Sequence, residues 1–190
     1  MDAKKAGLEQ ILMPIRKAQY GSLPFVAASP EKILDAIAQT AFNSLGVYGN
    51  CCRSTLWAVQ IHLRKEESAT LRASSVLAGG ICGTGETCGA VLGGMIAIGE
   101  ALGSDDFRDL GAYELANAKV REFLDQIRTR YTSSRCHAIQ TAVMGWCCDD
   151  PSKAARWTQE GGPLACAGVC ATAAHKAAAI ILACQASATT

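Results

Sequence analysis

The sequence lacks an excess of charge of either sign. Its 18 Lys and Arg residues nearly balance its 17 Asp and Glu residues, which leaves a formal net charge of +1. Without a basic excess, the chain offers little electrostatic attraction for a nucleic acid or an anionic membrane surface. It also lacks an uninterrupted apolar run of the roughly 20 residues that a membrane-spanning helix needs. We therefore expect neither a nucleic acid nor a membrane among its partners.

A secretory signal is also missing, because residues 1–7 lead directly into charged side chains rather than into an apolar segment. We expect a cytoplasmic protein whose thiols stay reduced. Ten cysteines in 190 residues is about 5%, below the roughly 8–10% typical of a small disulfide-stapled protein. With 49% apolar residues, the chain is expected to bury a core without disulfides. The cysteines therefore need another explanation.

No segment of useful length alternates apolar and polar residues as a strand does, and helical periodicity dominates. We predict an all-α fold, a single-domain bundle of about six to eight helices with a glycine-rich loop before the helix of Cys88. Residues 1–45 are assigned to an N-terminal helical extension and residues 46–190 to a cysteine-rich domain, within one compact whole. The expected helices span 8–20, 30–46, 51–64, 69–77, 86–102, 104–131, 136–146 and 164–186, and the helix 104–131 is expected to be the longest.

Familiar cysteine motifs are absent. The sequence contains no Cys-x-x-Cys, which argues against a zinc ribbon, a thioredoxin-type dithiol and a bacterial ferredoxin. Cys-x-x-Cys-His is absent too, so we expect no covalently attached c-type haem.

Four cysteines instead share a position, because each lies near the start of a different predicted helix. They are Cys51, Cys88, Cys136 and Cys166. Free backbone N–H groups and the positive end of the helix dipole favour a thiolate there. Thiolates are what an iron–sulfur cluster or a reactive redox site requires. The alternative is that these cysteines are small buried hydrophobic residues.

The same residues resemble a known family. The stretches Asn50-Cys51 and Gly85-Glu86-Thr87-Cys88-Gly89-Ala90-Val91-Leu92-Gly93, followed by Cys136 and Cys166, are similar to the redox-active C-GCAxxG-C-C family, whose relatives include split-Soret cytochrome c. The resemblance covers about residues 43–182. It implies a redox function and four shared cysteines, and the cytochrome implies that such cysteines hold an iron–sulfur centre.

The sequence departs from the family in three ways. It lacks a haem-attachment motif, it has an N-terminal extension of about 40 residues, and it carries six further cysteines that blur the ligand assignment. Cys170 lies one helical turn beyond Cys166, so either could be the fourth ligand. Cys82, Cys147 and Cys148 are further candidates, and the adjacent pair could form a strained disulfide or capture a soft metal ion.

Two cysteines are assigned to packing instead. Cys52 begins an apolar stripe with Leu56, Val59 and Leu63 at helical spacing, so it should face the core, while Cys51 points about 100° away. Cys184 lies within an apolar stretch and is also expected in the core.

The sequence thus predicts a redox protein that binds an iron–sulfur cluster through Cys51, Cys88, Cys136 and Cys166, with [2Fe–2S] favoured over [4Fe–4S]. Its role would be electron transfer to or from a partner reductase, and the chain could also form a homodimer. One alternative is a metal-free thiol–disulfide oxidoreductase or redox sensor, and another is a soft-metal binding protein. Whether it is an enzyme stays open, and if so it would be an oxidoreductase.

Overall fold

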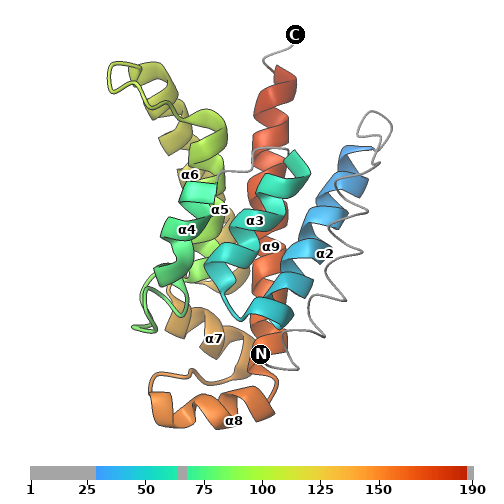
Figure 1. The fold of residues 1–190 in the computed structure, drawn as a ribbon, viewed down its shortest axis with the longest axis vertical. Coiled ribbons are helices and arrows are strands. Elements are labelled where there is room, and N and C mark those ends of the chain that lie inside the picture. The colour runs from blue at the N-terminus through green and yellow to red at the C-terminus, as the bar shows by residue number, and fades with distance from the viewer. Residues whose placement is uncertain (1–28, 64–67, 188–190) are drawn as a thin grey trace. The chain divides into compact units, whose positions relative to one another are not determined.

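The computed structural model describes residues 29–63 and 68–187 (Figure 1). In these ranges the regular structure is helical, apart from one isolated β-bridge between Thr87 and Arg135. The predicted all-α fold is therefore confirmed, and the predicted helix 8–20 lies outside the described residues. The helices are α2 (Pro30–Tyr48), α3 (Cys51–Leu63), α4 (Ser68–Ala73), α5 (Gly89–Leu102), α6 (Leu110–Tyr131), α7 (Cys136–Met144), α8 (Ala154–Gln159) and α9 (Gly162–Ser187), with short 3-10 helices η1 (Ser74–Leu77) and η2 (Pro151–Lys153).

Contacts divide the chain into two units, residues 1–33 and residues 34–190. The second unit contains all ten cysteines. Helix α2 runs without a break through position 45, and the predicted division of the chain at that position stays a prediction.

Helix α5 is the central helix of the second unit, and it packs against α3, α6 and α9. Its glycines permit this close approach. A Cβ atom at Gly93 would lie 2.5 Å from the Cys52 carbonyl oxygen, and one at Gly94 would lie 2.6 Å from the Phe123 ring. Neither position therefore accepts a side chain without movement of its neighbour. The core around α5 contains fully buried residues such as Leu56, Ile98 and Ile181.

Two predicted helix starts agree with the structure. Helix α2 begins at Pro30, where the fixed φ angle of proline suits the first helical position. Asn50 caps α3, because its Oδ1 accepts the Arg53 N–H at 3.0 Å, and its Nδ2 donates to the Ser75 carbonyl at 2.9 Å. The start of α3 is thereby fastened to η1.

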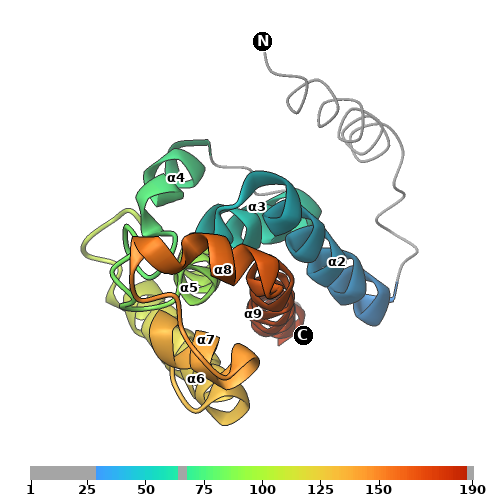
Figure 2. The same cartoon turned by 90° about the horizontal axis from the view of Figure 1, so that it is seen from below.

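Helices α3 and α9 both begin at the lower end of the view in Figure 1, where α7 and α8 also lie. Figure 2, drawn from below, shows α8 across this end of the bundle, and α8 packs against α9. One end of the second unit thus gathers several helix starts.

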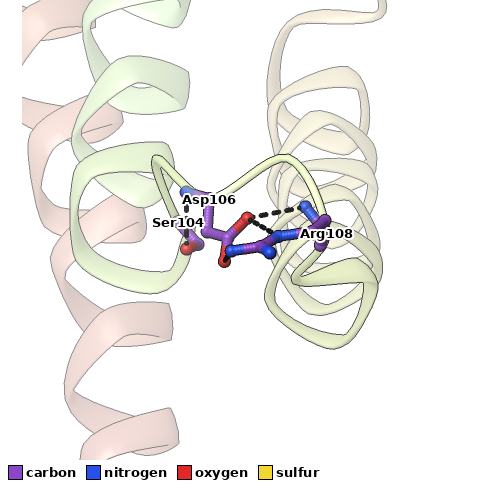
Figure 3. A network of polar contacts seen from close by, with 3 residues as sticks. All are labelled: Ser104, Asp106 and Arg108. Atoms are coloured by element: carbon purple, nitrogen blue, oxygen red, sulfur yellow. Dashed lines mark hydrogen bonds and ion pairs between the residues drawn. The ribbon is translucent and has the colours of Figure 1, made fainter.

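The connection between α5 and α6 differs from the prediction. Ser104, Asp105 and Asp106 were expected to open a helix, but α6 begins at Leu110 with Asp109 as its cap. Figure 3 shows the reason, since Ser104 Oγ accepts the Asp106 N–H, and Asp106 in turn accepts the backbone and guanidinium N–H groups of Arg108. These local bonds satisfy the polar groups in a turn and delay the helix.

Two further findings correct the prediction from the sequence. Helix α9, with 26 residues, is longer than the 22-residue α6, which was expected to be the longest. Helix α8 was not predicted. Among the described helices, α9 is long and apolar enough to cross a membrane by length and composition, but half of that stretch is buried within the chain, and one such helix is weak evidence.

Candidate functional site

Four cysteines line one cavity of about 480 Å³ at the end of the bundle where these helices begin. They are Cys51, Cys88, Cys136 and Cys166, which lie far apart in the sequence and belong to four different helices or their caps. The structure therefore brings together the four residues that the sequence singled out.

Three of the four occupy the predicted position at a helix start. Cys51 is the first residue of α3, Cys88 is the N-cap of α5, and Cys136 is the first residue of α7. Cys166 does not, because α9 begins at Gly162 rather than at the predicted Leu164, and this places Cys166 in the second turn.

The glycine-rich loop before α5 holds Cys88 and Cys136 side by side. The Cys88 N–H donates to the Ser134 carbonyl at 2.9 Å, and the Cys136 N–H donates to the Glu86 carbonyl at 2.6 Å. An ion pair of 2.9 Å between Arg135 and Glu86 joins the same two segments at the surface. The starts of α5 and α7 are thus fixed to each other by backbone bonds.

Two glycines keep space for the sulfur atoms. A Cβ atom at Gly89 would lie 2.4 Å from Cys51 Sγ and 2.8 Å from the Leu77 carbonyl oxygen. Gly80 has a φ angle of +71°, and a Cβ atom there would lie 2.6 Å from the Cys136 Cβ atom. A larger residue at either position would displace a cysteine of the cavity.

The electrostatics of the cavity differ from the expectation of thiolates at helix starts. A hydrogen bond between the Cys88 and Cys136 thiols, together with burial, raises the pKa of Cys88 well above its ordinary value. Burial, followed by the neighbouring Cys88 and Cys51 charges, raises the pKa of Cys166 to about 12. The metal-free thiols of Cys88 and Cys166 are therefore protonated at neutral pH.

Backbone N–H groups at the helix starts do lower the cysteine pKa values, as expected, but burial raises them by more. The N–H groups of Ala90 and Val91 lower the pKa of Cys88, and the Gly79 N–H lowers that of Cys51. Burial raises the pKa of Cys51 by more than this, so the net shift is upward. The depth of burial decides the sign of the shift, and the pattern of each helix by itself does not reveal that depth.

The remaining six cysteines do not line the cavity. Cys52 and Cys170 are fully buried, and the Cys170 thiol donates to the Cys51 carbonyl at 3.7 Å. Of the two cysteines one turn apart on α9, Cys166 lines the cavity and Cys170 does not. Cys52 packs in the core, as predicted. Cys184 is only half-buried, because it lies near the exposed end of α9, so its assignment to the core was wrong.

The secondary candidates are also placed elsewhere. Cys82 is exposed on the glycine-rich loop, where its thiol donates to the Val76 carbonyl at 3.1 Å. Cys147 and Cys148 are half-buried after α7 and do not line the cavity. Among residues 29–63 and 68–187, no three His, Cys, Asp or Glu side chains are arranged to hold a single metal ion.

Sequence reasoning missed Gln140. This side chain lines the cavity and is 8% exposed. Its Nε2 donates to Cys136 Sγ at 3.5 Å, and its Oε1 accepts the Cys148 N–H at 2.7 Å. Gln140 follows Cys136 by one helical turn, so the spacing on α7 could have revealed it. Trp157, another lining residue, was missed because its helix α8 was not predicted.

Fold and site together define an all-α protein with a cysteine-lined cavity built from helix starts and a glycine-rich loop. The family model described as "Putative redox-active protein (C_GCAxxG_C_C)" matches residues 49–180, which include every cysteine of the cavity, and the chain belongs to this family. Neither a curated protein nor a solved structure matches the chain significantly.

Proposed function

We propose that the chain binds an iron–sulfur cluster through Cys51, Cys88, Cys136 and Cys166, with [2Fe–2S] favoured, and transfers electrons to or from a partner reductase. The single observation that carries the proposal is the convergence of these four side chains on one cavity. Membership of a redox-active family supports the chemistry. Four cysteines are the usual ligand set of both [2Fe–2S] and [4Fe–4S] clusters.

The cavity fits such a group in its donors and its space. Gly89 leaves room beside Cys51 Sγ, and the N–H groups of Gly79, Ala90 and Val91 point at sulfur atoms. Hydrogen bonds to the ligand sulfurs adjust the reduction potential of iron–sulfur centres. When bound, the cluster would supply one-electron storage.

The chain's own residues would hold the group, shield it from water and give up protons. Burial raises the pKa values of Cys51 and Cys166, and the hydrogen bond to Cys136 followed by burial raises that of Cys88, so these thiols are protonated without metal. Each must lose its proton to become a thiolate ligand. Binding should therefore release protons and become weaker as the pH falls.

A second candidate function rests on the Cys88 and Cys136 side chains, which line the same cavity and whose segments are joined by backbone hydrogen bonds. These two side chains could form a disulfide without metal. Oxidation would break two S–H bonds, form one S–S bond, release two protons and pass two electrons to a disulfide-bearing partner. The partner would then be reduced to a dithiol.

The two candidates are separated by spectra of the full chain purified without oxygen, with neighbouring cysteines as matched controls. We expect visible absorption from the wild type and from Cys52→Ala and Cys170→Ala, and its loss from Cys51→Ala and Cys88→Ser. Colourless wild-type protein after reconstitution with iron and sulfide, with a Cys88–Cys136 disulfide after oxidation, would favour the dithiol function instead.

A further inference from the structure

The cavity is larger than a small cluster needs. If each heavy atom takes roughly the 30 Å³ of a water molecule, a four-atom core occupies roughly 120 Å³ and an eight-atom core roughly 240 Å³. The cavity measures about 480 Å³. Half of the space or more is therefore left for a second molecule, and the total lies within the range typical of ligand pockets.

Among the residues that the structure describes, the lining contains no charged side chain and no histidine. A charged ligand that is not bonded to the cysteines would lose its hydration there without gaining a counter-charge, which is costly. Phosphate-bearing and carboxylate-bearing molecules are thus poor candidates, and an uncharged molecule with a mostly apolar frame fits better. The apolar and aromatic lining residues are Leu45, Val47, Tyr48, Ala78, Ala90, Ile139, Trp157, Pro163 and Val169.

Gln140 supplies a fixed polar group in this lining. Only its oxygen can accept the Cys148 N–H at 2.7 Å, and this bond sets the orientation of the amide. One hydrogen of the Nε2 group is directed to Cys136 Sγ at 3.5 Å. An amide nitrogen carries two hydrogens, so the group can donate a second bond to a molecule beside Cys136.

We propose that the cavity binds a small, uncharged, mostly apolar molecule with a carbonyl oxygen, which accepts a hydrogen bond from Gln140 Nε2 next to the cysteines. This site is additional to the proposed cluster, and binding can be measured with or without one. A carbonyl oxygen is the acceptor that matches an amide donor without bringing a charge into the cavity.

The test compares two probes of the same shape, acetophenone and ethylbenzene, which differ by a carbonyl group. The full chain, labelled with ¹⁵N and kept reduced, is titrated with each probe, and Kd is obtained from chemical shifts. One net hydrogen bond corresponds to about fivefold in Kd. We expect acetophenone to bind about fivefold more tightly, with a shift of the Gln140 side-chain amide signals. The same titration of the protein reconstituted with iron and sulfide, in its oxidised state, gives the comparison with the cysteines occupied.

Three variants locate the site. Gln140→Leu should bind both probes equally, while the surface control Gln39→Leu should keep the preference. Gly46 lines the cavity, and a Cβ atom there would meet nothing within 4 Å, so Gly46→Phe should fold and weaken both probes at least tenfold.

Several results would overturn the proposal. The first is that neither probe binds up to its solubility limit, and the second is that both bind equally to the wild type. The third is that Gln140→Leu keeps the preference for acetophenone while Trp157→Phe loses it. Loss of binding when the cysteines are occupied would show that the cavity serves the metal group alone. Iron and sulfide content is a separate measurement, so failure here does not decide the proposed cluster.

Discussion

Replacement of Gly89 by alanine tests whether the space beside Cys51 is essential. The added methyl group would lie 2.4 Å from Cys51 Sγ and 2.8 Å from the Leu77 carbonyl oxygen, and backbone cannot move aside easily. Overpacking of this kind costs about 1–3 kcal/mol. In addition, Cys51 Sγ would be displaced from the cavity. We therefore expect Gly89→Ala to lower the free energy of unfolding by about 1–3 kcal/mol and to abolish cluster binding.

Gly99 provides a matched control in the same helix, because a Cβ atom there meets nothing within 4 Å. Alanine is favoured over glycine inside a helix by about 1 kcal/mol, so Gly99→Ala should stabilise the protein slightly and keep the cluster. Denaturant unfolding of the reduced, metal-free variants gives both stabilities, and iron analysis gives the cluster. Equal unfolding midpoints and equal iron contents for the two variants would refute the reasoning.

Three further predictions concern single side chains. Cys166→Ala should remove the cluster while Cys170→Ala keeps it, as iron analysis of both would show, and the reverse result would make Cys170 the ligand. Burial lowers the pKa of His62 from 6.5, so the unfolded state takes up a proton first as the pH falls below 6.5. The wild type should thus lose more stability than His62→Gln between pH 7 and pH 5 in denaturant unfolding, and parallel curves would contradict this. Because the pKa of Cys166 is about 12 instead of 9.0, its alkylation in metal-free protein should be about a thousandfold slower than that of an ordinary thiol, whereas exposed Cys82 should react quickly, as mass spectrometry can measure.

Much of the fold followed from local chemistry in the sequence. Pro30 marks a helix start because it has no N–H group that needs a partner and its φ angle is already helical, and Asn50 marks one because its side chain accepts a backbone N–H. The start of α6 was misplaced because Ser104 and Asp106, which are also good caps, bond within a turn instead. Helix α8 was missed because six residues are too short for a helical period to be visible.

The site was predictable in its members but not in its chemistry. From glycines, caps and helix starts, the sequence predicted that four cysteines lie together at helix starts. Their burial depends on how the helices pack together, which those local signals do not show. That burial reverses the expected direction of the pKa shifts of Cys51 and Cys166, and at Cys88 the hydrogen bond to Cys136 and burial do so together. Gln140 was missed for a related reason, because its role depends on the Cys148 backbone beyond the end of α7.

The most direct test of the central claim is the iron and acid-labile sulfide content of the full chain, prepared without oxygen and reconstituted. The proposed function predicts iron and sulfide in equal amounts, two of each per chain for the favoured [2Fe–2S] cluster, and the loss of both in Cys88→Ser. Protein without iron, or with iron but no sulfide, would contradict it.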